Sequence, residues 1–317
     1  YIFMRIISLL PSATEILCEL GLEDNIFGVT NECKYPSSIN LKEKVLSTEV
    51  NFDELNSIEI DKIINESINT NKPIFSLDIN KIEEIRPDFI VTQDLCEVCA
   101  VSSKEINELL GKLTFKPQII KTSPNSIKGI NDSIINISQI LGVNKIGEGI
   151  VDKINSDIKT ITSITKDNID KPRVFCMDWL DPIYSAGHWV PEMVTIAGGL
   201  NMNEGDDVNS QKISFEQLLE FAPHFIFIMP CGYNIERTLN EINILLENPE
   251  LNKIPAFNNG QVYIVDAYSY FSKPSHRILE GIKIITRTIN GKNYKYNPEP
   301  DAILNLQNYM HFEFFAG

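Results

Sequence analysis

The stretch "IEEIRPDFIVTQDLC" (residues 82–96) predicts a helix, a proline, a buried strand and a cysteine-bearing loop, in that order. A second stretch, "LLEFAPHFIFIMPCG" (residues 218–232), has the same order. Proline just ahead of a strand ends the preceding helix, because it lacks the amide hydrogen and crowds the residue before it. The two stretches therefore predict a duplicated plan, in which each half of the chain places a thiol at the end of a strand.

Short β-branched runs alternate with helical patterns on both sides of these stretches. The alternation predicts a parallel sheet with helices on its faces in each half of the chain. The predicted strands lie near residues 5–9, 26–30, 74–77, 89–92 and 118–121 in the first half, and near 173–177, 225–229 and 262–265 in the second. The predicted helices include residues 13–20, 103–113 and 276–289.

Apolar residues recur every three to four positions from Ile146 to Ile164, which predicts one amphipathic helix over residues 144–166. A helix between two lobes is a stiffer spacer than a Gly/Ser-rich tether. The expected fold is therefore α/β, with two Rossmann-like lobes joined by one long rigid helix. The expected divisions are an N-terminal lobe (1–124), linking helices (125–167), a C-terminal lobe (168–290) and a C-terminal tail (291–317) that we interpret as an appendage.

The charge balance argues against several classes of partner. The 317 residues include 28 basic and 43 acidic side chains, for a net charge of −15. Such a chain repels nucleic-acid phosphates and anionic membranes. No apolar run approaches the roughly 18 residues needed to span a bilayer, so we expect a soluble protein. We also expect a monomer. Met4 as the native start, with no signal-peptide pattern, predicts a cytoplasmic location, and a processed form would be extracytoplasmic.

Two cysteines in "VTQDLCEVCAV" (residues 91–101) are the first chemically able group. Cys96 and Cys99 follow a predicted strand and precede a predicted helix start, where a thiol pKa is lowered. Three interpretations stay open: a redox dithiol, part of a metal site, or the lining of a ligand pocket. Further metal ligands could come from Cys33, Cys231 and His188.

The loop "WLDPIYSAGHWVPE" (residues 179–192) contains both tryptophans of the chain. Aromatic rings with polar tips are typical of a pocket for a large planar ligand, and burial in the core is the alternative. His188 is equally compatible with a hydrogen-bonded structural role. The candidate ligand contacts of this loop are Trp179, Tyr184, His188, Trp189 and Glu192.

Two more strand-end segments extend this candidate site. "AYSYFSKPSHR" (residues 267–277) adds Tyr270 and Phe271 after the strand at 262–265. "LLPSATE" (residues 9–15) opens a helix whose start offers free backbone amides to a ligand, and Ser12, Ala13 and Thr14 are the candidate polar and backbone contacts there. The chain has no dinucleotide, P-loop, zincin or hydrolase motif, and no nucleophile with an evident base. We therefore expect a binding protein rather than an enzyme.

Taken together, "SLLPSATE" (residues 8–15), "RPDFIVTQDLCEVCAV" (residues 86–101) and "AGHWVPE" (residues 186–192) resemble a known family. It is the helical-backbone class of ABC-transporter substrate-binding proteins, with its cobalamin and iron–siderophore members, and in particular the cobalamin-binding branch. The resemblance spans about residues 5–290. It implies two lobes with a ligand cleft, a corrinoid or similar metal chelate as ligand, no obligatory cofactor and an ABC permease as partner.

One position departs from the family. Transporter-docking members carry a glutamate on each lobe, seven residues before the proline that precedes the strand. Glu216 fills this position before Pro223, whereas Asn80 stands there before Pro87. The resemblance thus implies one docking acid, at Glu216, where the family has two.

Three hypotheses follow for the function. The first is a non-catalytic binder of a corrinoid or related chelate. The second is a cytoplasmic thiol- or metal-dependent protein or enzyme on the same scaffold, which would use Cys33, Cys96, Cys99 and Cys231. The third is a siderophore or haem binder. The loops quoted above are aromatic and thiol-rich rather than basic, which favours the first over an anionic siderophore.

Overall fold

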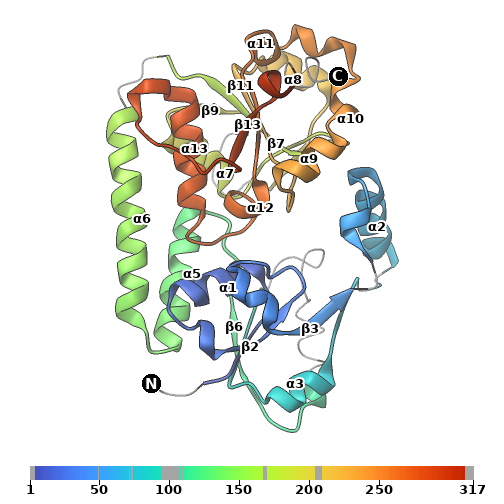
Figure 1. Cartoon of the computed structure of the whole chain (residues 1–317), viewed down its shortest axis with the longest axis vertical. Helices are drawn as coiled ribbons and strands as arrows, with labels where there is room; N and C mark the ends of the chain where they lie inside the picture. Colours follow the sequence, from blue (N-terminus) through green and yellow to red (C-terminus); the bar gives the residue numbers. More distant parts are fainter. Residues whose placement is uncertain are drawn as a thin grey trace. The chain divides into compact units, whose positions relative to one another are not determined.

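The computed structural model describes residues 4–48, 50–70, 72, 74–93, 108, 110–166, 170–203 and 209–310. The chain divides into two compact units, which Figure 1 shows coloured along the sequence. Unit 1 comprises residues 1–124 and 128–151, and unit 2 comprises residues 125–127 and 152–317.

Unit 1 is built on a sheet that has six strands within the described residues, in the order β4-β3-β2-β1-β5-β6. Neighbouring strands are parallel except for the antiparallel pair of β3 and β4. The strands are β1 (Ile6–Ser8), β2 (Ile26–Thr30), β3 (Glu43–Thr48), β4 (Phe75–Leu77), β5 (Phe89–Thr92) and β6 (Gln118–Lys121). The helices are α1 (Pro11–Glu19), α2 (Ser57–Thr70), α3 (Ile79–Ile85) and most of α5 (Ile127–Ile140).

Unit 2 has a sheet in the order β10-β8-β7-β11-β12-β13, with β9 paired to β7, over the same described ranges. Its strands are β7 (Arg173–Trp179), β8 (Tyr184–Ser185), β9 (Leu200–Asn201), β10 (Gln211–Lys212), β11 (Phe225–Ile228), β12 (Val262–Val265) and β13 (Ile303–Asn305). Its helices are α7 (Val190–Ile196), α8 (Phe215–Phe221), α9 (Ile235–Glu241), α10 (Asn243–Leu246), α11 (Pro255–Asn258), α12 (Ala267–Tyr270) and α13 (Ile278–Asn290).

The long helix predicted over residues 144–166 is confirmed as α6 (Asn144–Thr165), which has 22 residues. Its apolar stripe is buried at Ile154 and Ile161. Within unit 2, the carboxylate of Asp157 in α6 forms an ion pair with the ammonium group of Lys283 in α13, with an N–O distance of 3.2 Å. Figure 1 shows α13 running beside the C-terminal part of α6. This half-buried ion pair fixes α6 to the body of unit 2.

The internal repeat is visible in the backbone of both units. Helix α3 ends at Arg86 with φ 48° and ψ 62°, and helix α8 ends at Ala222 with φ 46° and ψ 62°. Both residues stand directly before the proline of the repeat, and both are left-handed although neither is glycine. This conformation ends a helix by turning the chain away from its axis. The predicted order of helix, proline and strand is confirmed in both places.

Several sequence expectations need correction. The sheets are mixed rather than purely parallel, because β3–β4, β7–β8, β8–β10 and β12–β13 are antiparallel. The tail is not a loose appendage, because β13 pairs with β12 and both Ala302 and Leu306 are buried. The other predicted strands are present with small shifts at their ends. The predicted helix at 103–113 lies largely outside the described residues.

Among the described residues, no helix combines the length and the apolar character that a bilayer crossing requires.

Candidate functional site

The carboxyl ends of β7, β11 and β12 bring separate aromatic residues to one edge of the unit 2 sheet. These three strands are parallel neighbours, so their ends lie side by side. The amide of Cys231, after β11, donates to the carbonyl of Asp178 in β7 at 3.1 Å. The amide of Tyr268, after β12, donates to the carbonyl of Tyr233 at 2.9 Å. Backbone hydrogen bonds thus connect the three strand ends into one surface.

We call this surface the aromatic edge and define it by Trp179, His188, Tyr233, Tyr268 and Tyr270. The rings of Trp179 and Tyr233 meet edge to face, with centroids 5.5 Å apart and planes at 64°. Such T-shaped contacts hold aromatic rings in fixed orientations. The indole nitrogen of Trp179 is shielded from solvent and has no hydrogen-bond partner among the described residues. The donor of Trp179 is therefore enclosed by protein atoms and unpaired within the described residues.

Tyr233 of the aromatic edge is only 2% exposed. Trp189 and Phe271 are buried as well. They are 8% and 2% exposed, and the indole nitrogen of Trp189 donates to the carbonyl oxygen of Phe271 at 2.9 Å. Gly281 of α13 packs against Phe271 so closely that a Cβ atom there would lie 3.1 Å from its ring and 2.5 Å from the carbonyl oxygen of Tyr270. The hydrogen bond between Trp189 and Phe271 thus joins the two loops that carry the aromatic edge. Their predicted contact with a ligand stays a prediction.

His188 occupies a strained backbone position beside these residues. Its φ is 55°, and its ring lies 5.7 Å from that of Trp189 at a tilt of 33°. A positive φ at a non-glycine residue is uncommon and is held by its surroundings. Nearby, burial raises the pKa of Asp178, while Ser210, which donates to its carboxylate, and the proximity of His188 oppose the rise. The amide of Gly187 donates to the same Ser210 hydroxyl.

Three basic residues that the sequence analysis did not select lie on the aromatic edge. The guanidinium carbon of Arg237 is 4.0 Å from the centroid of the Tyr233 ring, and that of Arg277 is 5.0 Å from the Tyr270 ring. The ammonium nitrogen of Lys273 is 3.7 Å from the centroid of Tyr268. The expectation that these loops lack basic residues is therefore wrong.

Cation–π interactions are stronger where water is excluded. Lys273 is only 8% exposed. Both Lys273 and Arg277 belong to the quoted segment "AYSYFSKPSHR", and Arg237 stands four residues after Tyr233. The signal that could have found them was this interleaving of basic and aromatic residues.

The other predicted contacts of unit 2 differ in accessibility. Tyr184 is partly buried in β8, opposite Trp179 in the strand pairing. Cys231 is exposed at the end of β11. The carboxylate of Glu192 accepts the amide of Ile127 at 3.2 Å, where α5 begins. An acid at a helix start satisfies an open amide and interacts well with the helix dipole, so Glu192 has a structural partner in this structure.

In unit 1 the predicted contacts gather at the ends of β1 and β2. The hydroxyl of Thr14 lies 2.9 Å from that of Ser8 and 3.1 Å from the sulfur of Cys33, and Thr30 approaches the same sulfur at 3.2 Å. Thr14 and Cys33 are both buried, and burial raises the pKa of the Cys33 thiol, opposed by the hydrogen bonds from the two threonines. Cys33 is thus an enclosed neutral thiol.

The start of α1 keeps the predicted geometry. Pro11 is the first helical residue and Leu10, the residue before it, is extended. The amides of Ser12 and Ala13 consequently have no acceptor within the helix. Both residues are buried, at 7% and 1% exposure, and their predicted contact with a ligand stays a prediction.

The thiol or metal hypothesis concerns Cys33, Cys96, Cys99 and Cys231. Cys96 and Cys99 lie outside the described residues. Within the described ranges, no group of three or more His, Cys, Asp or Glu side chains is arranged to hold a metal ion. Cys33 and Cys231 belong to different units.

The predicted docking residue and its counterpart are both placed. Glu216 is exposed in the first turn of α8, next to the capping box of Ser214, whose hydrogen bond lowers the pKa of Glu216. In α3, Asn80 is exposed, and Lys81 forms an ion pair of 3.3 Å with Glu43 and donates to the carbonyl of Lys44. The acid on this side, Glu43, is therefore paired with Lys81, the neighbour of Asn80 in the sequence.

Known proteins share this architecture. The chain is 25% identical over 281 residues to the vitamin B12-binding protein of Vibrio vulnificus, covering 88% of this chain and 87% of the relative. It is 23% identical over 298 residues to the uncharacterized ABC transporter substrate-binding lipoprotein YvrC of Bacillus subtilis, covering 92% and 81%.

The fold itself matches a solved structure. A periplasmic haem-binding protein from Pseudomonas aeruginosa superposes with a TM-score of 0.70 at 15% identity, covering 94% of this chain and 96% of that one. The two-sheet α/β fold of this chain is thus shared with that protein. A model of the family described as "Periplasmic binding protein" matches residues 6–269, and the chain therefore belongs to the periplasmic binding protein family.

Proposed function

We propose that the chain binds a large planar metal chelate at the aromatic edge of unit 2, with a corrinoid of the cobalamin type as the first candidate. The observation that carries the proposal is that neighbouring side chains already hold the aromatic rings at these strand ends in place. Trp179 and Tyr233 fix each other, and cations fix Tyr233, Tyr268 and Tyr270. Preorganised rings cost little ordering entropy on binding.

The chemistry of the edge suits such a ligand in two ways. Aromatic faces bury the flat surface of a macrocycle, which supplies most of the affinity. Arg237, Lys273 and Arg277 can donate to carbonyl, carboxylate or phosphate oxygens at the periphery of the macrocycle. The sequence similarity to a vitamin B12-binding protein supports the corrinoid, and the structural likeness to a haem-binding protein makes haem the comparison ligand.

We further propose that the protein works outside the cytoplasm and delivers its ligand to an ABC permease. The exposed carboxylate of Glu216 would engage a basic residue of the permease. The similarity to an ABC transporter substrate-binding lipoprotein supports this role. Because Asn80 replaces the second docking acid, the interaction would depend more on unit 2 than on unit 1.

Calorimetric titration of the purified chain tests the ligand directly. We expect cyanocobalamin to bind at one site with Kd below about 1 μM, equivalent to roughly 8 kcal/mol. Haem titrated in parallel, as hemin, identifies the alternative chelate. No heat and no change in melting temperature with either compound would contradict the proposal.

A further inference from the structure

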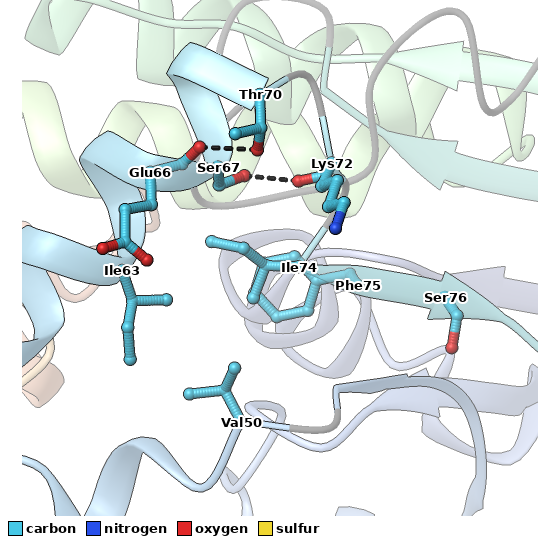
Figure 2. Close-up of a pocket in the computed structure, with 9 residues that line it drawn as sticks. All are labelled: Val50, Ile63, Glu66, Ser67, Thr70, Lys72, Ile74, Phe75 and Ser76. Carbon is cyan, nitrogen blue, oxygen red and sulfur yellow. Dashed lines mark hydrogen bonds between the residues drawn. The ribbon is translucent and has the colours of Figure 1, made fainter.

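Unit 1 contains a pocket that the proposed function does not use. It has a volume of about 510 Å³ and lies between α2 and β4. Figure 2 shows the side chains of Val50, Ile63, Ile74 and Phe75 facing the same space from these elements and from the loop after β3. Small-molecule sites occupy about 300–1,000 Å³ and are mostly apolar, so both the size and the lining are suitable.

The polar groups around this pocket are largely turned to the backbone. The hydroxyl of Ser67 donates to the carbonyl of Lys72 at 2.6 Å, and that of Thr70 donates to the carbonyl of Glu66 at 2.6 Å. Both bonds are drawn in Figure 2. The hydroxyl hydrogens of Ser67 and Thr70 are therefore already used within the protein, and Glu66 and Lys72 line the pocket beside them.

A smaller polar pocket lies next to the first one. It has a volume of about 260 Å³, it shares Val50 with the first pocket, and it lies at the ends of β2 and β3. Phe52 lines the smaller pocket and Phe75 the larger one, and their ring centroids are 6.3 Å apart. The other residues of the smaller pocket are Asn31, Glu32, Lys34, Thr48 and Asn51. The two pockets thus adjoin at Val50.

The charges indicate what kind of molecule fits. The larger pocket carries one acid and one base, Glu66 and Lys72. The smaller pocket carries Glu32 and Lys34, whose charged atoms are 3.8 Å apart. Neither pocket has an excess of positive or negative charge that would select an ion. Apolar side chains together with balanced charge in the larger pocket favour an uncharged, largely apolar molecule.

We propose that this pocket is a second binding site, specific for an uncharged apolar small molecule. It shares no residue with the aromatic edge and lies entirely within unit 1. The proposal therefore goes beyond the proposed function and does not depend on it.

The neutral fluorophore N-phenyl-1-naphthylamine, which brightens in apolar surroundings, tests the site on the full chain. We expect a saturable increase in fluorescence at one site per chain. Ile63→Trp fills the chamber from α2, and Thr70→Trp covers it from the exposed end of the same helix. Each should weaken the probe at least about tenfold. Ile58→Trp is the matched control, because Ile58 is 50% exposed on α2 and does not line the pocket.

Circular dichroism checks that each variant is folded, and Thr70→Trp keeps the test valid if Ile63→Trp does not fold. Trp179→Ala, at the aromatic edge, should leave the probe titration unchanged. The proposal is overturned if the wild-type chain gives no saturable signal, or if folded Thr70→Trp binds the probe as tightly as Ile58→Trp. Loss of the signal in Trp179→Ala would place the probe in unit 2 and would overturn it as well.

Discussion

The indole nitrogen of Trp189 donates a 2.9 Å hydrogen bond to the carbonyl oxygen of Phe271. This bond joins the loop after β8 to the loop after β12, and both residues are buried. The two tryptophans of the chain consequently differ in role. Trp189 stabilises the loops, whereas Trp179 has an indole nitrogen with no partner in the described ranges and belongs to the aromatic edge.

Replacing the tryptophans by phenylalanine separates these roles. Trp189→Phe leaves the buried carbonyl of Phe271 without its donor, which should lower the free energy of unfolding by about 1–3 kcal/mol. Trp179→Phe removes no hydrogen bond among the described residues and should cost less. Urea unfolding of both variants measures the difference. Equal losses would show that the hydrogen bond to Phe271 does not stabilise the fold.

Gly281 permits the close approach of α13 to α12. A Cβ atom there would lie 2.5 Å from the carbonyl oxygen of Tyr270, which is backbone and cannot rotate away. We expect Gly281→Ala to lower the free energy of unfolding by about 1–3 kcal/mol and to weaken ligand binding. Gly149→Ala in α6 is the matched control, because nothing lies within 4 Å of its Cβ position. That change should stabilise the chain by up to about 1 kcal/mol.

Glu192 should matter for stability through the start of α5. Its carboxylate accepts the amide of Ile127. Glu192→Ala removes both the acceptor and the charge at this helix start, and should cost about 0.5–2 kcal/mol in thermal or urea unfolding. Glu299→Gln, at an exposed loop position, serves as the control. If Glu192→Ala unfolds like this control, the contact contributes nothing measurable.

Asp178 should give stability a specific dependence on pH. Burial raises its pKa above the ordinary value of 3.8, although Ser210 and His188 oppose the rise. The folded chain thus holds this proton more tightly than the unfolded chain. The resulting stabilisation is complete below about pH 4 and is lost as the pH rises through the folded pKa.

Asp178→Asn keeps an acceptor for the Ser210 hydroxyl but carries no charge. The free energy of unfolding of this variant, measured from about pH 4 to 7, should fall less with rising pH than that of the wild type. Parallel curves for the two proteins would show that Asp178 ionises normally in the folded chain.

Much of the fold could be predicted from local patterns, because strands such as β2 and β12 are short β-branched runs with clear ends. The helix at α6 followed from its apolar period. Antiparallel additions such as β13 could not be predicted, because its pairing with β12 depends on a return of the chain from residues about forty positions away. Local sequence carries no signal for such a return.

The candidate site could be predicted in residue type but not in arrangement. The aromatic segments were visible in sequence, and the ends of parallel strands gave their common edge. The placement of Arg237, Lys273 and Arg277 over tyrosine rings depends on the path of the loops after the strands. The burial of Trp189 and the partner of Glu192 likewise depend on tertiary packing.

The affinity of the Trp179→Ala variant for cyanocobalamin, compared with wild type in the same calorimetric titration, tests the central claim most directly. Tyr294→Ala is the control, because Tyr294 packs against Tyr296 and is not part of the aromatic edge. We predict that Trp179→Ala weakens binding at least about tenfold while Tyr294→Ala binds as the wild type does. Wild-type affinity in a folded Trp179→Ala variant would contradict the claim that the aromatic edge holds the ligand.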